Sequence, residues 1–355
     1  MSMKVLHVLN TGKYSGAENV VITLIHALEG EVECAYTSPN GPIREILQEE
    51  KITYFPISST AVNPKELKQI ILQYKPNIIH THDYNAGIMA GLTGTNIPII
   101  NHLHNNTPWL RKICPKSLAY FISCVRYKKI LTVSDSVMDE FIFGSWVAKK
   151  SMVVGNPINL ADIRKKADER GILRGSSDVI FLGRLSHQKR PIFFLEVIAD
   201  VVKKVPDLRV AMVGSGELYG EVEAKIEELK LENYVNMYGF QKNPYGLLKE
   251  AKVMCMPSGW EGFGLAAVEG LAFGKPVIAA PVGGLKRIIN YQCGNLCESK
   301  EEYVAELERL LSDSSYYREK SEGAQKRAGE YDNIESYSRK IRQLYYSISG
   351  HKLSE

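Results

Sequence analysis

The sequence predicts an α/β protein made of two doubly wound, Rossmann-like domains. Its 355 residues are more than one ordinary core accommodates, so two domains are expected. Short, wholly apolar runs alternate with helical patterns, which is typical of parallel sheets covered by helices on both faces. The alternation runs in two series, and the second begins after Asn156 and Pro157.

The first series predicts an N-terminal domain over residues 1–157. Its expected strands are KVLHVLN, VECAYTS, ITYFPI, NIIHTH, IPIINHLH, KKILTVS and SMVVGNP, with helices beginning near Ala17, Pro42 and Pro64 between the earlier ones. The second series predicts a C-terminal domain over residues 158–330. Its expected strands are SDVIFLGR, LRVAMVG, YVNMYGF, KVMCMP and KPVIAAP. Residues 331–355 are expected to form a last helix.

Composition excludes several functional classes. A hydrophobic content of 45% and a charged content of 24% are those of a globular protein, and a net charge of +4 is too small to indicate nucleic-acid binding. The six cysteines form no C-x-x-C pair, which favours reduced thiols in a cytoplasmic protein over zinc or disulfides. The first apolar run is too short for a signal peptide, and no run approaches a membrane span, so any membrane contact is expected to be peripheral.

The stretch PSGWEGFGLAAVEGLA, residues 257–272, predicts an anion site between a strand and a helix. Amide groups at a helix N-terminus lack intrahelical partners and attract anions. Gly262 and Gly264, expected in the first helical turn, let a phosphate approach the backbone around Phe263 and Leu265. The acids Glu261 and Glu269 flank this site, and sugar hydroxyls are the obvious donors for them. The combination indicates a nucleotide sugar.

A second strong pattern, FLGRLSHQKRP, places two cations after an apolar strand in the same domain. Arg184 offers a planar fork of donors and Lys189 a mobile point charge, a pairing suited to phosphate oxygens. Two basic residues at this spacing ordinarily lie on the solvated surface of a protein. Their position beside the glycine turn favours a diphosphate clamp.

These motifs resemble those of the retaining glycosyltransferases of family 4, also called glycosyl transferases group 1. The pattern E-G-F-G-x-x-x-x-E matches the family signature and G-R-L-x-x-x-K matches its cationic loop. The resemblance implies the GT-B fold, with an acceptor-side N-terminal domain, a donor-side C-terminal domain and a last helix that crosses back. It implies transfer from a nucleoside diphosphate sugar, most often UDP-linked, to an acceptor hydroxyl in cell-surface polysaccharide or glycolipid synthesis, without a cofactor.

The resemblance adds donor contacts in two weaker motifs. In TGKYSGAEN it points to Ser15 and Gly16, with Gly16 expected at a positive φ or a close backbone approach, although the family has two glycines where this chain has Ser15. In MYGF it points to Gly239 and Phe240 beside the base. The alternative for TGKYSGAEN is a plain strand-to-helix connection. The alternative for MYGF is ordinary core packing. GSGE, residues 214–217, is a weak fragment of a dinucleotide fingerprint, and Arg287 stands where the family has a glutamate.

Two H-x-H patterns end the fourth and fifth expected strands, His80 with His82 and His102 with His104. Residues i and i+2 share one side of a strand, so each pair could ligate a metal. No carboxylate or cysteine is patterned with them, which favours imidazoles facing a polar ligand. We therefore expect no metal ligands. By resemblance, His104 contacts the donor sugar.

Residues 109–130 combine basic and aromatic residues without any acid. On a partly apolar helix they would suit an anionic membrane surface, at the inner face of the membrane, and a lipid-carried acceptor. The alternative is a helix packed on the sheet with a solvated basic face.

The catalytic set expected from these motifs is Glu261, His104, Arg184 and Lys189. Arg184, Lys189 and the amides after Glu261 would stabilise the leaving diphosphate in place of a metal ion. Glu261 would accept hydrogen bonds from the donor sugar and Glu269 from the ribose, while His104 orients the donor. Three alternatives share these features: a nucleotide-sugar epimerase, a phosphorylase and a non-catalytic nucleotide-sugar-binding protein. The sequence names neither the sugar nor the acceptor.

Overall fold

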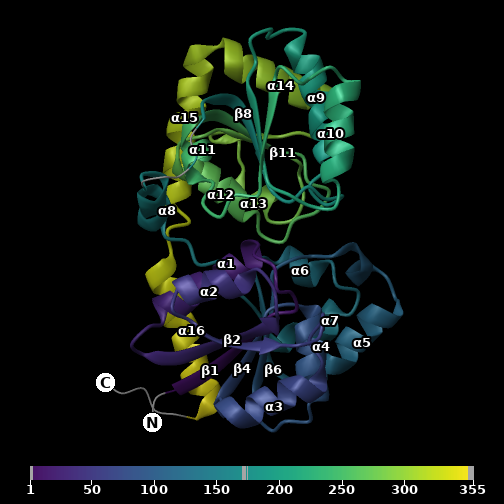
Figure 1. Cartoon of the computed structure of the whole chain (residues 1–355), viewed down its shortest axis with the longest axis vertical. Helices are drawn as coiled ribbons and strands as arrows, with labels where there is room; N and C mark the ends of the chain where they lie inside the picture. Colours follow the sequence, from purple (N-terminus) through teal and green to yellow (C-terminus); the bar gives the residue numbers. More distant parts are fainter. Residues whose placement is uncertain (1–2, 170–172, 174, 351–355) are drawn as a thin grey trace. The chain divides into compact units, whose positions relative to one another are not determined.

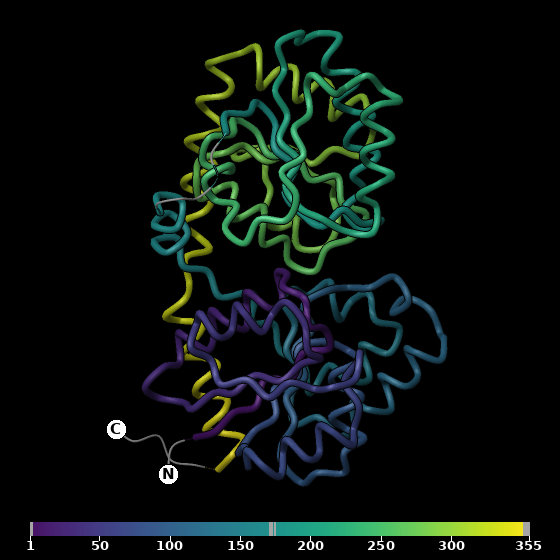
Figure 2. Tube along the Cα trace, in the orientation of Figure 1, coloured from purple at the N-terminus to yellow at the C-terminus, as the bar shows by residue number. Residues whose placement is uncertain are grey.

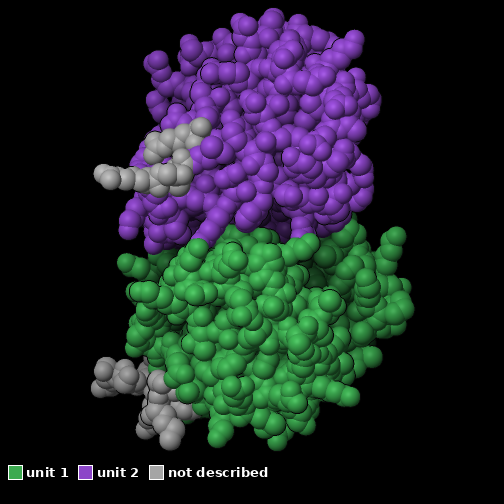
Figure 3. All heavy atoms as spheres, in the orientation of Figure 1, with its two compact units in different colours: residues 1–157, 333–355 green, residues 158–332 purple. Residues whose placement is uncertain are grey.

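A computed structural model describes residues 3–169, 173 and 175–350. The chain forms two compact units, shown in different colours in Figure 3. Unit 1 comprises Met1–Pro157 and Asn333–Glu355, and unit 2 comprises Ile158–Asp332. Each unit has its own parallel sheet (Figure 1).

The sheet of unit 1 has seven strands in the order β3-β2-β1-β4-β5-β6-β7. All pairings are parallel. The strands are β1 (Met3–Val8), β2 (Val32–Pro39), β3 (Thr53–Ile57), β4 (Ile78–Thr81), β5 (Ile99–Leu103), β6 (Tyr127–Thr132) and β7 (Ser151–Val153). Every residue of β4 and β5 is buried, as expected for central strands covered on both faces.

The helices of unit 1 lie between these strands, except the last one, which follows unit 2 in the chain. They are α1 (Gly16–Ala27), α2 (Ile43–Glu49), α3 (Pro64–Tyr74), α4 (Tyr84–Leu92), α5 (Pro115–Ser123), α6 (Ser136–Asp139), α7 (Gly144–Val147) and α16 (Ile334–Ser349), with 3-10 turns η1 (Pro108–Arg111), η2 (Cys124–Arg126) and η3 (Ala148–Lys150). Capping residues in the sequence determine where several of these helices start. Asn63 caps α3 by accepting a hydrogen bond from the amide of Glu66 at 2.9 Å, and Pro64 occupies the first turn.

Helix α16 belongs to unit 1 although it ends the described chain. Tyr337, Ile341 and Tyr345 are buried in one core cluster with residues of β1, β4 and α1. Figure 2 shows this yellow segment running beside the purple start of the chain. The core of unit 1 therefore joins the two ends of the sequence.

The sheet of unit 2 has six strands in the order β10-β9-β8-β11-β12-β13, again all parallel. The strands are β8 (Ser177–Leu182), β9 (Val210–Val213), β10 (Val235–Gly239), β11 (Ala251–Met256), β12 (Val277–Ala279) and β13 (Gly294–Leu296). One core cluster contains residues of α8, α11, α12, α13 and α15, and the other contains residues of α9, α10 and α14. The helices of unit 2 are α8 (Leu160–Ala167), α9 (Pro191–Val202), α10 (Tyr219–Glu228), α11 (Tyr245–Glu250), α12 (Leu265–Ala272), α13 (Leu285–Ile288), α14 (Lys300–Ser312) and α15 (Ser314–Gly329).

Both sheets reverse their strand order once. The reversal lies between β1 and β4 in unit 1 and between β8 and β11 in unit 2. In open α/β sheets, ligands bind beyond the carboxyl ends of the strands at such a point. The prediction of two doubly wound sheets is confirmed. The loops after these four strands are the expected positions of ligand contacts.

Candidate functional site

The strong motifs of unit 2 meet at one edge of its sheet. Strands β8 and β11 are hydrogen-bonded parallel neighbours, so the loop containing Arg184 and the turn containing Glu261 follow adjacent carboxyl ends. Lys189 bridges the two segments by ion-pairing with the Glu261 carboxylate. The sequence could not show this contact, because the two residues come from different strand–loop–helix units.

Glu261 is a buried carboxylate with a defined set of donors. It is 5% exposed and accepts hydrogen bonds from Lys189 Nζ and from Ser258 Oγ, the latter at 2.8 Å. The segment before it is tied to the cationic loop, since Gln188 Nε2 donates to the carbonyl of Trp260 at 2.9 Å and the amide of Gly259 donates to the carbonyl of Gln188 at 2.7 Å. The cation expected to bind phosphate is thus held by the acid expected to bind sugar.

The glycine turn differs from its prediction in one detail. Helix α12 begins at Leu265, so Gly262 and Gly264 precede the helix and do not lie in its first turn. Gly264 is the N-cap with φ +96, a conformation that favours glycine. The first amides of α12 still point out of this end of the helix, which is the geometry that suits an anion.

A second glycine pair supports this turn from β12. A Cβ atom on Gly283 would lie 1.6 Å from the carbonyl oxygen of Glu261, and one on Gly284 would lie 2.1 Å from that of Phe263. The amide of Gly284 donates to the carbonyl of Gly262 at 3.1 Å. The glycines of PVGGLKRII are therefore explained by close backbone packing. Arg287, at the position of the family glutamate, is exposed.

The loop after β8 is held by backbone hydrogen bonds to the GSGE turn, residues 214–217. The amide of Leu185 donates to the carbonyl of Ser215 at 3.1 Å, and that of Leu218 donates to the carbonyl of Leu185 at 3.0 Å. A Cβ atom on Gly214 would lie 1.9 Å from the carbonyl oxygen of Gly183. This close packing is sufficient to explain why residue 214 is glycine, and no contact with a nucleotide is needed to explain it. The side chain of Arg184, in this loop, is exposed to solvent.

Glu269 lies one helical turn into α12 and is buried. Tyr245 of α11 donates to its Oε1 at 2.9 Å. Burial raises the pKa of Glu269, while the hydrogen bond from Tyr245 and the charges of Lys166 and Lys189 oppose that rise. The neutral form of this carboxyl is therefore favoured more than that of an exposed glutamate.

Gly239 is the last residue of β10 and Phe240 follows it, on the same side of the strand reversal as β8 and β9. Gly239 has φ +63, and its carbonyl accepts from the amide of Gly214 at 2.8 Å. Phe240 is 54% exposed, which excludes core packing as its explanation. An exposed aromatic ring at a strand end is suited to contact with a planar base.

The glycine turn of unit 1 follows β1. Ser15 is the N-cap of α1, and its Oγ donates to Glu18 Oε2 at 2.5 Å while Thr11 Oγ1 donates to Oε1 at 3.3 Å. Burial raises the pKa of Glu18, with the bond from Ser15 opposing it. Gly16 has no positive φ, and a Cβ atom added to it would meet nothing within 4 Å. The expectation of a positive φ at Gly16 is therefore wrong, because Gly16 is the first residue of α1.

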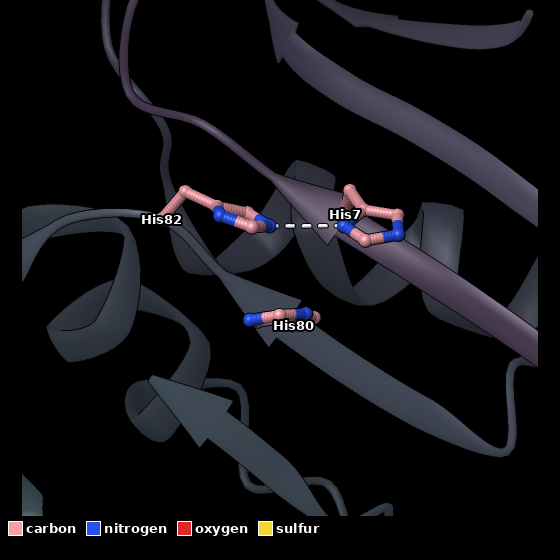
Figure 4. A group of neighbouring side chains, drawn as sticks. All are labelled: His7, His80 and His82. Atoms are coloured by element: carbon pink, nitrogen blue, oxygen red, sulfur yellow. Dashed lines mark hydrogen bonds between the residues drawn. The ribbon is translucent and has the colours of Figure 1, made fainter. Parts of the chain in front are cut away.

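Histidines gather where the strand order of unit 1 reverses. His7 on β1, His80 and His82 at the end of β4, and His102 and His104 at the end of β5 form a continuous set of ring contacts. His7 Nδ1 lies 2.9 Å from His82 Nε2, as the dashed line in Figure 4 shows, and His82 Nδ1 lies 3.1 Å from His104 Nε2. His80 Nδ1 lies 2.5 Å from the hydroxyl of Tyr345 on α16.

These imidazoles are neutral because of their burial. Burial lowers the pKa of His7 to about 3 and that of His104 to about 4. It holds the pKa values of His80, His82 and His102 well below the ordinary value, and the neighbouring imidazoles add to the effect. His104, which the sequence singled out, is the half-buried member. It can meet a ligand as a hydrogen-bonding imidazole without carrying charge.

The basic stretch of unit 1 is helical only in part. It comprises η1, α5, η2 and the first residues of β6, so Lys128 and Lys129 lie on the strand that the KKILTVS run predicted. The apolar residues Ile113, Leu118, Ile122 and Val125 of this stretch are exposed, as are Ile142 and Trp146 farther along. We call these six residues, with Arg111, Lys112, Lys116 and Arg126, the basic–apolar surface. Among the described residues, none of the helices is both long and apolar enough to cross a membrane.

Several residues of the site gave no signal in the sequence. Ser258 lies within the stretch 257–272, but none of the sequence motifs assigns it a function. In unit 2, Tyr245 of α11 contacts Glu269. In unit 1, His7 of β1 and Tyr345 of α16 contact the histidines His82 and His80. Their contribution depends on contacts between segments far apart in the chain.

Comparison with known proteins places the chain in a family. Residues 14–162 match the family described as Glycosyltransferase Family 4, and residues 162–327 match Glycosyl transferases group 1. A relative from Campylobacter jejuni, GalNAc-alpha-(1->4)-GalNAc-alpha-(1->3)-diNAcBac-PP-undecaprenol alpha-1,4-N-acetyl-D-galactosaminyltransferase, is 25% identical over 93% of this chain and 95% of that protein. The Escherichia coli UDP-Gal:alpha-D-GlcNAc-diphosphoundecaprenol alpha-1,3-galactosyltransferase is 23% identical over 79% of this chain and 80% of that protein.

The fold agrees with this placement. The crystal structure of Anabaena Alr3699/HepE in complex with UDP-glucose superimposes with a TM-score of 0.83 at 20% identity, covering 97% of this chain and 100% of that chain. Together, the two family matches and the paired parallel sheets show that the chain belongs to the family 4, or group 1, glycosyltransferases and has their GT-B fold.

Proposed function

We propose that this glycosyltransferase moves a sugar from a UDP-sugar to an acceptor hydroxyl with retention at the anomeric carbon. The observation that carries the proposal is the joint position of Lys189, Glu261 and the N-terminus of α12 at one edge of unit 2. Positive groups suited to a diphosphate and a carboxylate suited to hydroxyls meet there. The names of the relatives and the HepE complex support UDP as the nucleotide.

The charges at this edge match the charge that develops in the reaction. Breaking the bond between the anomeric carbon and the diphosphate leaves negative charge on the phosphate oxygens. Arg184, Lys189 and the first amides of α12 stabilise that charge, and fixed donors of this kind are among the largest contributions to catalysis. Lys189 can turn from Glu261 to a phosphate when the Glu261 carboxylate receives sugar hydroxyls instead.

Retention follows from a front-face displacement. The acceptor oxygen bonds to the anomeric carbon on the side from which the phosphate departs, and the departing phosphate oxygen takes the acceptor proton. No separate general base is needed, and Glu261 is not a covalent nucleophile. Glu269 accepts from the ribose, while Ser15, Gly16, Gly239 and Phe240 complete the donor contacts.

The two units supply different parts of this reaction. Unit 2 holds the nucleotide, whereas unit 1 supplies the acceptor site and His104, whose neutral imidazole orients the donor sugar. The two cations replace a divalent ion on the diphosphate, so transfer proceeds without added metal. Full activity after treatment with EDTA is the expected result, and a loss of activity restored by magnesium would contradict it.

The acceptor is a lipid-linked saccharide at the cytoplasmic face of a membrane. The basic–apolar surface supports this part of the proposal, since exposed apolar side chains among cations suit an anionic lipid surface. Two relatives named above act on undecaprenyl diphosphate-linked sugars. We expect the protein to sediment with vesicles that contain phosphatidylglycerol and not with pure phosphatidylcholine.

A matched pair of variants tests the surface. Ile122 and Trp146 are 68% and 79% exposed, and replacing both by serine should reduce vesicle binding several-fold. Leu72 on α3 is 63% exposed but lies outside the surface, so Leu72→Ser should bind as the unchanged protein does. Equal binding of all three proteins would remove the membrane from the proposal.

The deciding experiment for the activity is a panel of nucleotide sugars with lipid-linked and soluble acceptors, scored by release of UDP and by the anomeric configuration of the product. Acceptor-dependent UDP release with an α-linked product from an α-linked donor is expected. Interconversion of UDP-sugars without acceptor would indicate an epimerase. Binding without turnover in every combination would indicate a nucleotide-sugar-binding protein.

A further inference from the structure

The histidine cluster of unit 1 brings together ligands that the sequence separates. Two groups of three imidazoles, His7 with His80 and His82, and His82 with His102 and His104, each offer nitrogen atoms that lie within 4.8 Å of one another. Each group takes its members from two neighbouring strands. The two H-x-H patterns are separate in sequence, and only the sheet places them side by side.

The first group is already satisfied in part by protein contacts. Figure 4 shows the rings of His7 and His82 edge to edge, with His80 on one side of them. His80 Nδ1 is engaged by Tyr345, and all three residues are buried. His7 Nε2 and His80 Nε2 lack a partner within the described residues, but no member of this group is at the surface.

The second group has the features of a ligand site. Both nitrogens of the buried His102 lack a hydrogen-bond partner within the described part of the chain, as does His104 Nδ1. A buried polar group without a partner costs about 1–3 kcal/mol, and an ion is one of the few explanations for it. His104 is half-buried at the end of β5, which gives an ion a route of entry.

One distance within this group suits a tetrahedral ion, and the ligand atoms of all three residues lie within 4.8 Å of one another. His82 Nδ1 and His104 Nε2 are 3.1 Å apart, close to the roughly 3.3 Å between two nitrogens that each lie about 2.0–2.1 Å from one zinc ion. The other nitrogen of His82 faces His7 Nδ1 at 2.9 Å. Metal-bound imidazoles ordinarily have such a partner, which fixes the tautomer and the orientation of the ring.

We propose that His82, His102 and His104 bind one zinc ion, or a similar borderline divalent ion, with His7 as the positioning residue behind His82. Three protein ligands leave a fourth position for water. Imidazole ligands select zinc, cobalt, nickel or copper over magnesium or calcium. The ion engages His104, so it inhibits sugar transfer, and this second consequence rests on the proposed function.

Cobalt provides a direct test of the site. The full-length protein is treated with EDTA, freed of chelator and titrated with Co²⁺, then with Zn²⁺. One Co²⁺ per chain with visible absorption typical of tetrahedral coordination, displaced by Zn²⁺ and not by Mg²⁺, is the expected result. No tetrahedral spectrum would overturn the proposal.

Variants identify the ligands. His102→Leu should abolish the cobalt spectrum, and His7→Phe should weaken binding by about 10–100-fold. His26, which is exposed on α1 and outside the cluster, provides the control, since His26→Ala should bind cobalt unchanged. If circular dichroism shows that His102→Leu is unfolded, His104→Gln takes its place, and unchanged binding in a folded His104→Gln protein contradicts the site.

The activity measurement separates this inference from the proposed function. Zn²⁺ should inhibit UDP release by the unchanged protein and by His26→Ala. A protein that binds cobalt as described but releases no UDP with any donor retains the metal site and loses the proposed function. A protein that releases UDP but gives no cobalt spectrum keeps the function and loses the metal site.

Discussion

At the residue scale, Arg184 and Lys189 differ in how the fold holds them. Lys189 is paired with the buried Glu261, whereas Arg184 is exposed above a loop that backbone hydrogen bonds hold in place. The pairing keeps a buried carboxylate from being left without a cation, which would be costly. Arg184 is therefore the cleaner position at which to test the diphosphate clamp.

Replacing Arg184 by alanine should lower kcat about 10²–10³-fold, the usual cost of losing one donor to developing negative charge. Steady-state UDP release measures the effect. Lys252 provides the control, because it pairs with Asp178 at 2.9 Å near the starts of β11 and β8, at the opposite edge of the sheet. Lys252→Ala should leave kcat unchanged, and an unchanged rate in Arg184→Ala would remove Arg184 from the mechanism.

Glu269 predicts a pH dependence of stability. Its pKa is raised by burial from an ordinary value of 4.5, so the folded protein binds this proton more tightly than the unfolded chain does. The resulting stabilisation is complete below about pH 4.5 and is lost as the pH rises through the pKa of the folded state. Glu269→Gln cannot ionise and should gain stability relative to the unchanged protein as the pH rises.

Urea unfolding at several pH values from about 5 to 8 measures this difference. The same variant should transfer sugar more slowly, since an amide accepts fewer hydrogen bonds from the ribose than a carboxylate. A stability difference that stays constant across the pH range would show that Glu269 does not titrate as its burial indicates.

At the element scale, the turn between β11 and α12 depends on a neighbouring turn. Gly283 and Gly284, between β12 and α13, lie against the backbone of residues 261–263. The anion site at the start of α12 is thus fixed by backbone contact as well as by its own sequence. This close backbone contact is the physical reason for the two glycines.

Gly283→Ala should disrupt that contact. The new Cβ atom would lie 1.6 Å from a backbone oxygen at φ +48, so we expect a loss of at least about 1–3 kcal/mol in the free energy of unfolding and reduced donor binding. Gly220 on α10 has no atom within 4 Å of its Cβ position. Gly220→Ala should be neutral or stabilise by up to about 1 kcal/mol, and equal stability of both variants would contradict the argument.

At the scale of the whole molecule, unit 1 is completed by the last helix. Ile341 of α16 is fully buried with Tyr337 and Tyr345 against strands from the start of the chain. Removing most of its side chain should cost about 2–5 kcal/mol. The N-terminal unit therefore depends on residues more than 300 positions away.

Thermal unfolding followed by circular dichroism tests this dependence. Ile341→Ala should lower the transition of unit 1 and leave that of unit 2 in place, provided that the two units unfold separately. The exposed Arg339 of the same helix is the control, and Arg339→Ala should change stability by no more than about 0.5 kcal/mol. Equal effects of both substitutions would show that α16 contributes little to unit 1.

The sequence by itself determined the fold class and the central turns of unit 2. Apolar runs marked the parallel strands, and the motifs around Arg184 and Glu261 marked the loops, because both signals are local and repeat in fixed spacing. The family membership follows from the same residues. The sequence did not fix every helix start, as the position of Gly264 before α12 shows.

Only the tertiary structure decided which side chains meet. The pairing of Lys189 with Glu261, the bond from Tyr245 to Glu269 and the assembly of His82, His102 and His104 each join residues from different elements. Such contacts depend on strand order and helix packing, and the side-chain pattern of a single segment carries no record of the segments that pack against it.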